Sequence, residues 1–131
     1  DKPVEQCADL GLQCVYAPFG PYYINRRYGC DNIGAGHGRD DIEAVYNHPV
    51  PDNPNVIGTQ AIFWTEFVSL DRDLEYLALP RIAAIAENAW IDPAQKDFSS
   101  FQARIAKDTE WLNLAGYNYA GHQLSTPRQQ Q

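Results

Sequence analysis

The chain has 131 residues, the size of one domain or of a piece of a larger one, and its formal net charge is −7. This acidic balance disfavours non-specific binding to nucleic acid or to an anionic membrane surface, and a hydrophobic content of 44% excludes a disordered acidic tail. The longest apolar run, 77–86, is interrupted by Pro80 and Arg81 and is far shorter than the roughly 20 residues that span a bilayer. We expect a folded protein that binds neither nucleic acid nor membranes.

The first half of the chain predicts one helix, one strand and a long loop. Residues 3–10 are typical of the last turns of a helix, which Gly11 ends in a left-handed conformation. Residues 12–17 predict a short buried strand. The segment 19–55 is rich in Gly, Pro, Asn and Tyr, so we expect a loop there with one helical turn at 41–46.

The second half predicts another strand followed by helices. Residues 56–64 form the strand candidate, and a helix is expected from Asp71, broken and restarted at Pro80. Residues 98–115 predict a final helix, with Asp97 as its cap. Apolar residues at helical spacing predict a buried stripe after the break, made of Ile82, Ile85, Ala86 and Ala89.

Two short apolar strands, each followed by a loop and helical material, predict an α/β fold with βα units of a parallel sheet. A complete (β/α)₈ barrel needs about 250 residues, so this chain could form only about the last quarter of one. We expect residues 1–124 to be one structural segment and residues 125–131 to be a polar, disordered tail.

The cysteines do not predict a metal site. Cys7, Cys14 and Cys30 show no CxxC spacing and no nearby pair of histidines. We expect free, buried or partly buried thiols, with no metal and no cofactor.

Candidate binding residues follow the two strands, because βα units place binding groups after the carboxyl ends of their strands. The loop after the first strand holds Tyr22, Tyr23 and Asn25, and a turn there is expected to aim both phenols and the amide outward. Trp64 and Glu66 are expected on one face at the end of the second strand, and an aromatic ring beside a carboxylate suits a sugar. A core indole with a surface acid is the alternative.

Several motifs in order resemble glycoside hydrolase family 20. Residues 58–66 read GTQAIFWTE, where the family reads G-x-Q-x-x-L-W-[GT]-E, and residues 80–90 read PRIAAIAENAW, where it reads P-R-L-x-A-x-A-E-x-x-W. Further matches cover most of the chain: Tyr22 to Asn25, Val45 to Asn47 with Pro49, Glu75-Tyr76, Phe101, Arg104-Ile105 and Gly116 to Tyr119.

The resemblance implies the fold and the activity of the parent protein. The family has a (β/α)₈ TIM barrel, and the matched motifs look like its C-terminal portion, about the last two βα units. Its members remove terminal β-linked N-acetylglucosamine or N-acetylgalactosamine from amino-sugar glycans. The 2-acetamido oxygen of the sugar attacks C1, while an Asp orients the acetamide and the adjacent Glu acts as general acid and base.

The resemblance also implies roles for single residues. Tyr23 would hydrogen-bond the acetamide oxygen, Trp64 would stack on the sugar or line the acetamide pocket, and Glu66 would accept bonds from the 4- and 6-hydroxyls. Asn25 stands where many members have Asp, and Tyr22 is counted with the substrate-binding residues. We interpret the remaining motif residues as structural, a buried helix face with an ion pair: Arg81, Glu87 and Trp90.

No position of this chain corresponds to the catalytic Asp-Glu pair, which lies further upstream in the family. We therefore expect the isolated chain to be inactive and the remainder of the barrel to come from the same gene or from a partner chain. A non-catalytic carbohydrate-binding or interaction module is the alternative, and self-association through the open sheet edge is a further possibility. The resemblance favours a periplasmic, secreted or lysosome-like compartment over the cytoplasm.

Overall fold

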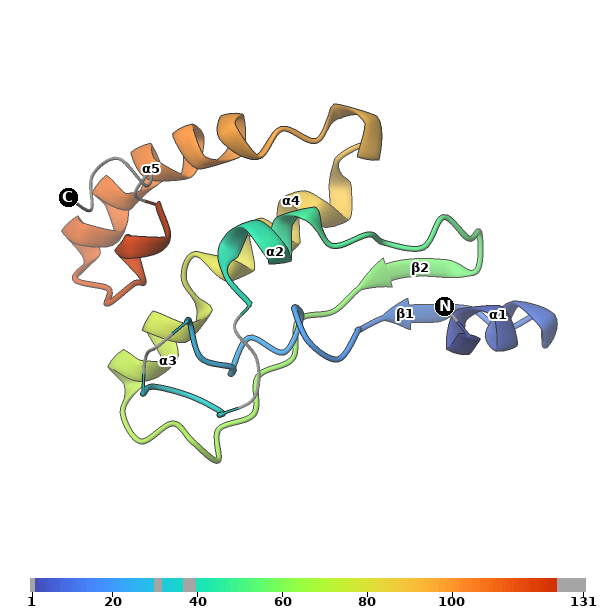
Figure 1. Ribbon diagram of the computed structural model, residues 1–131, viewed down its shortest axis with the longest axis horizontal. Helices are drawn as coiled ribbons and strands as arrows, with labels where there is room; N and C mark the ends of the chain where they lie inside the picture. Colours follow the sequence, from blue (N-terminus) through green and yellow to red (C-terminus); the bar gives the residue numbers. More distant parts are fainter. Residues whose placement is uncertain (1, 30–31, 37–39, 125–131) are drawn as a thin grey trace.

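The computed structural model describes residues 2–29, 32–36 and 40–124. Two short strands lie side by side and point in the same direction; one helix precedes the first strand, and the other helices lie mostly beyond the carboxyl ends of the strands (Figure 1). The elements in chain order are α1 (Lys2–Asp9), β1 (Cys14–Tyr16), α2 (Ile42–Asn47), β2 (Val56–Thr59), α3 (Asp71–Ala78), α4 (Arg81–Trp90), the short 3₁₀ helix η1 (Pro93–Gln95), α5 (Phe98–Ala115) and η2 (Gly121–Leu124).

The two strands pair in parallel, as predicted. Cys14 lies opposite Val56 and Tyr16 opposite Thr59, with an irregularity of register after Cys14. Beyond the strands, the backbone of Ile62 donates to Tyr22 O at 2.8 Å and accepts from Ile24 N at 2.9 Å. This continuation ties the loop after β1 to the segment after β2, so both approach the same end of the sheet.

Both strands are shorter and more exposed than predicted. The expectation of a buried strand at 12–17 is wrong, because Val15 is 50% exposed, and Ile57 of β2 is 60% exposed. In the described part of the chain the sheet has two strands, and no other layer covers the side chains of Val15 and Ile57. Continuous apolar strands are typical of sheets buried on both faces. The chain is therefore a partial α/β piece whose sheet is incomplete.

Helix ends set by local chemistry agree with the predictions. Gly11 has φ 66°, and Leu12 N donates to Cys7 O while Gly11 N donates to Ala8 O, which closes α1. The carboxylate of Asp97 accepts from Ser100 N at 3.0 Å and begins α5. Gly116 ends α5 at φ 77°.

The core lies where α2 packs between α4 and α5. The rings of Tyr46 and Phe101 stack with their centroids 4.8 Å apart. Side chains from the loop after β1 and from three helices form this core: Tyr22, Ile24, Ile42, Val45, Tyr46, Ala84, Ile85 and Phe101.

The buried face of α4 differs from the predicted stripe. Only Ile85 of the four predicted residues is buried, and Ile82, Ala86 and Ala89 are exposed. The face that packs inward instead presents Arg81 and Asn88. Apolar spacing could not identify this face, because two of its residues are polar. The nitrogens of Arg81 and Asn88 donate to backbone carbonyls, and Asn88 also donates to the Tyr22 hydroxyl.

Arg81 is the most extensively bonded side chain of this face. It is 1% exposed, and its guanidinium lies 3.6 Å from the centroid of the Tyr28 ring. Its nitrogens donate to the carbonyls of four loop residues: Ile24, Arg26, Arg27 and Asp40. Burial lowers the pKa of Arg81, an effect that the neighbouring Tyr28 and Asp40 oppose.

Glu87 and Trp90, the other two residues of the predicted structural motif, lie in different environments. Glu87 forms the ion pair, with Arg104 of α5 as its partner. The expectation of burial is wrong for Trp90, which is 91% exposed in this partial fold.

Three further expectations concern the cysteine thiols, the C-terminal tail and membrane-spanning helices. Cys7 and Cys14 are free and partly buried, whereas Cys30 and the predicted tail 125–131 lie outside the described residues. None of the helices in the described ranges combines the length and apolarity that crossing a membrane would need.

We predict that Arg81→Met lowers the free energy of unfolding by about 3 kcal/mol or more, because buried carbonyls lose their donors. Urea denaturation followed by circular dichroism measures this change. Arg72→Met, at an exposed position of α3, is the matched control and should change stability by less than about 0.5 kcal/mol. Equal stability of the two variants would contradict the role given to Arg81.

Candidate functional site

A pocket of about 400 Å³ lies among the segments that follow the carboxyl ends of β1 and β2. The predicted residues Tyr23, Asn25, Trp64 and Glu66 all line it. The other residues of its lining are Phe19, Arg26, Ala35 and Phe67. The structure therefore brings four of the five predicted site residues together in one hollow.

Backbone hydrogen bonds place the first wall of this pocket. Tyr23 N donates to Gly20 O at 3.0 Å, and the turn needs the positive φ of 114° that Gly20 adopts. Ala35 N donates to Asn25 O at 2.8 Å, which fastens the opposite end of this short segment. Tyr23 and Asn25 are thus held by main-chain bonds on both sides.

The second wall lies in a loop and not on a strand. β2 ends at Thr59, so the expectation that Trp64 and Glu66 share one strand face is wrong. Val68 N donates to Thr65 O at 3.0 Å and closes a turn around Glu66. The indole of Trp64 is 56% exposed, so its ring is available to a molecule in the pocket.

Aromatic and charged groups meet at the rim. The rings of Phe19 and Tyr23 are 5.1 Å apart in an edge arrangement. The guanidinium of Arg26 lies 5.3 Å from the Phe19 ring centroid, and its Nη1 is 3.0 Å from Asp40 Oδ2. The pocket therefore combines aromatic faces with one carboxylate, one guanidinium and one amide.

The amide of Asn25 has an unusual environment. Asn25 is almost completely buried, and its Oδ1 atom has no hydrogen-bond partner among the described residues. A buried acceptor without a donor costs free energy.

Tyr22 does not line the pocket, and the expectation that its phenol points outward is wrong. Its side chain is fully buried, and its hydroxyl accepts a hydrogen bond from Asn88 Nδ2 at 3.1 Å. Burial, with a smaller effect of the neighbouring Tyr16, raises the pKa of Tyr22 to about 12. Successive residues of an extended segment point to opposite sides, so Tyr23 faces the pocket while Tyr22 faces the core.

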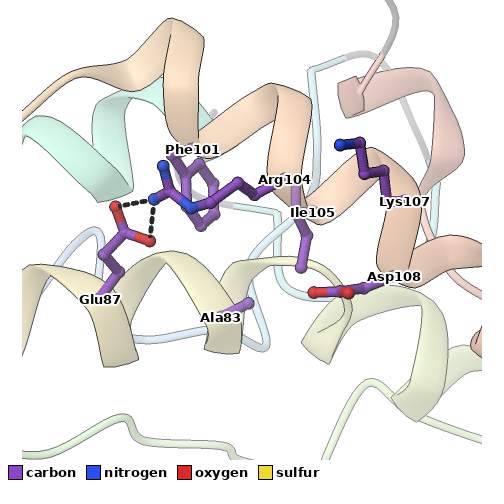
Figure 2. Close-up of a pocket in the computed structure, with 7 residues that line it drawn as sticks. All are labelled: Ala83, Glu87, Phe101, Arg104, Ile105, Lys107 and Asp108. Carbon is purple, nitrogen blue, oxygen red and sulfur yellow. Dashed lines mark hydrogen bonds and ion pairs between the residues drawn. The ribbon is translucent and has the colours of Figure 1, made fainter.

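A second pocket, of about 390 Å³, lies between α4 and α5 (Figure 2). One of its two carboxylates, Glu87, already accepts hydrogen bonds from Arg104 and from the Tyr46 hydroxyl. These bonds join three helices, which is a structural role. The pocket beyond the strands is the better candidate, because its aromatic rings are open to a ligand.

Sequence reasoning missed Phe19, Arg26 and Phe67. Each lies within a few residues of a predicted site residue, so proximity along the chain was the available signal. Across the described ranges, no cluster of three or more His, Cys, Asp or Glu side chains is suited to a metal ion.

Comparisons with known proteins give a consistent result. The profile "Glycosyl hydrolase family 20, catalytic domain" matches residues 1–93. The Beta-N-acetylhexosaminidase of Cellulomonas fimi is 31% identical over 134 residues, which covers 95% of this chain and 27% of the relative. The Beta-hexosaminidase of Porphyromonas gingivalis is 35% identical over 122 residues, or 86% of this chain and 16% of the relative. The chain therefore spans about a quarter or less of these relatives.

Solved structures resemble the fold. The GH20 exo β-N-acetylglucosaminidase of Vibrio harveyi, solved in complex with N-acetylglucosamine, aligns with a TM-score of 0.80 and 25% identity over 90% of this chain and 20% of its own. The GH20 β-N-acetylhexosaminidase of Streptomyces coelicolor A3(2) aligns with a TM-score of 0.77 and 24% identity, over 87% of this chain and 25% of its own. The chain thus corresponds to a fragment of a TIM-barrel catalytic domain.

We predict that Tyr22→Phe lowers the free energy of unfolding by about 1 kcal/mol, because Asn88 loses one hydrogen-bond acceptor in the core. Thermal or urea denaturation measures this difference. Tyr23→Phe is the matched control one residue away and should stay within about 0.5 kcal/mol of the parent protein. The opposite order of stabilities would mean that the core and pocket assignments of these two phenols are exchanged.

Proposed function

The chain belongs to glycosyl hydrolase family 20, and on that premise we propose that it forms one wall of the sugar pocket of a β-N-acetylhexosaminidase. The substrate is a glycan with a terminal β-linked N-acetylglucosamine or N-acetylgalactosamine. The observation that carries this proposal is the shared pocket of Tyr23, Trp64 and Glu66. A phenol donor, an aromatic face and a carboxylate acceptor are the three groups that an amino sugar needs for recognition.

The chain supplies about the last two βα units of the (β/α)₈ barrel. The parallel pairing of β1 with β2 and the exposed apolar side chains of Val15 and Ile57 support this assignment. In the complete barrel, neighbouring strands and the interior layers would cover those side chains. The pocket lies beyond the carboxyl ends of the strands, where TIM barrels have their active sites.

Tyr23 positions the reacting group. Its hydroxyl donates a hydrogen bond to the acetamide oxygen of the substrate, which attacks C1 of the same sugar. The turn at Gly20 and the main-chain bonds around Asn25 hold this part of the wall in place. Holding the nucleophilic oxygen near attack geometry accelerates an intramolecular step.

Trp64 and Glu66 recognise the sugar itself. The Trp64 indole packs against the sugar ring or its acetamide group, and Glu66 accepts hydrogen bonds from the 4- and 6-hydroxyls. A carboxylate that binds these hydroxyls selects terminal sugars, because a glycosidic bond at either position removes a donor. Asn25 keeps a hydrogen-bonding amide at this wall of the pocket.

The catalytic Asp-Glu pair belongs to the remainder of the barrel. The isolated chain therefore binds one side of the sugar and does not hydrolyse it. No observation favours the alternative of a non-catalytic module.

We predict that Glu66→Gln in the complete enzyme lowers kcat/KM for a 4-nitrophenyl N-acetyl-β-glucosaminide about 30-fold, equivalent to about 2 kcal/mol of transition-state stabilisation. The amide retains the shape of the side chain but loses the charged acceptor. Steady-state kinetics at constant pH measures the effect.

Glu110→Gln, at an exposed position of α5, is the control and should leave kcat/KM within about twofold of the parent enzyme. An unchanged kcat/KM in the Glu66 variant would remove this carboxylate from the sugar site. An absence of turnover in the parent enzyme would contradict the proposed function as a whole.

A further inference from the structure

Two cysteines lie next to each other at the end of the sheet that is remote from the sugar pocket. Cys7 is in the last turn of α1 and Cys14 is the first residue of β1, and these two elements contact each other. Figure 1 shows α1 beside the amino end of β1, whereas the loop that carries Tyr23 follows its carboxyl end. The cysteine pair is therefore separate from the proposed sugar site.

The two thiols are direct neighbours. A side-chain hydrogen bond joins the thiols of Cys7 and Cys14. Burial first, and then the charge and the hydrogen bond of Cys7, raise the pKa of the Cys14 thiol. Both cysteines are free and only partly buried, so a small molecule in solution can reach them.

Main-chain and amide hydrogen bonds hold both cysteines in place. Leu12 N donates to Cys7 O at 2.8 Å, across a turn in which Gly11 adopts φ 66°. Cys14 N donates to Asn55 O at 2.8 Å, and the side-chain amide of Asn55 donates to Leu12 O at 2.8 Å. A disulfide forms without backbone movement only where two cysteines already have a suitable separation and orientation. The turn and Asn55 keep this pair together before any bond forms.

The pair is too small for a metal site. A structural zinc ion takes four ligands, and two thiols supply half of them. In the part of the chain that the structure describes, no cluster of three or more His, Cys, Asp or Glu side chains is suited to a metal ion. Two adjacent thiols without further ligands are instead suited to a covalent bond with each other.

We propose that Cys7 and Cys14 are a disulfide-forming pair, and that the bond between their sulfurs fastens α1 to β1 when the protein meets a disulfide oxidant such as oxidised glutathione. One cysteine thiolate attacks the oxidant, forms a mixed disulfide and releases one glutathione thiol. The second cysteine attacks the protein sulfur of this mixed disulfide, which forms the internal bond and releases the second glutathione thiol. The two cysteines lose two protons and two electrons, and the oxidant gains both.

The cross-link acts on stability and not on turnover. It closes the loop 7–14, which restrains the unfolded chain and so favours the folded one. In barrels of this class the carboxyl ends of the strands carry the active site, and the amino ends contribute to stability. The cysteine pair lies at the amino end of β1, so this inference does not depend on the proposed function.

The test maps the disulfide in the complete enzyme that contains this chain, after incubation with oxidised glutathione and alkylation of the remaining thiols. Trypsin together with an endoproteinase that cleaves before Asp places the three cysteines in three peptides, 1–8, 9–26 and 28–30. Mass spectrometry should find peptides 1–8 and 9–26 joined, and dithiothreitol should separate them. Cys30→Ser is the matched control and should retain this link, whereas Cys14→Ser should abolish it.

Thermal unfolding measures the consequence of the bond. The oxidised enzyme should unfold at a midpoint about 2 °C above that of the reduced enzyme. This difference should disappear in Cys14→Ser and persist in Cys30→Ser. The value of kcat/KM should not change between the two redox states, because the pair lies away from the pocket.

Four results would overturn the proposal. They are thiols of Cys7 and Cys14 that both stay free, mixed disulfides of the two with glutathione, a link from either one to Cys30, and a cross-linked enzyme whose unfolding midpoint is unchanged. The comparison of oxidised with reduced samples of the parent enzyme does not depend on whether a variant folds. An enzyme that does not cleave 4-nitrophenyl N-acetyl-β-glucosaminide in either state contradicts the proposed function and not this inference.

Discussion

The position of the pocket depends on the burial of one guanidinium. Arg81 begins α4 and reaches into the loop after β1, where it donates to carbonyls on both sides of the pocket wall: Ile24, Arg26, Arg27 and Asp40. These peptide groups belong to neither helix nor strand, and within the described ranges the guanidinium is the donor that reaches all four carbonyls. A loop rich in Gly, Pro and Asn thereby acquires a fixed shape, and Tyr23 and Asn25 lie within it. Helix α4, the second helix after β2, thus holds the pocket wall formed by the loop after β1.

The pocket is one side of a larger site. The family relationship and the incomplete sheet agree on this, because the chain covers 27% of one curated relative and leaves Val15 and Ile57 of its strands uncovered. The parallel pairing of β1 and β2 brings the two following segments to one end of the sheet, which is why residues about 40 positions apart meet. We propose that the recognition groups belong to this chain and that the acid and base of the reaction belong to the remainder of the barrel.

Features set by a few neighbouring residues could be predicted from the sequence, and features set by distant contacts could not. The ends of α1 and α5 were predictable because Gly11, Asp97 and Gly116 act through local backbone geometry. The buried face of α4 was not, since Arg81 and Asn88 are buried only because carbonyls from far along the chain satisfy them. At the site, the motifs identified Tyr23, Asn25, Trp64 and Glu66, but they could not separate Tyr22 from its neighbour. Which of two adjacent tyrosines faces the core is decided by the bridge to Ile62 and by the amide of Asn88.

A crystal structure of the complete enzyme with bound N-acetylglucosamine would locate the sugar relative to this pocket. We expect electron density for the sugar in the pocket beyond β1 and β2, with the Tyr23 hydroxyl at the acetamide oxygen, the Trp64 ring against the sugar and the Glu66 carboxylate at its outer hydroxyls. A sugar that contacts none of these three side chains, for example one bound between α4 and α5 beside Glu87 and Arg104, would contradict this expectation.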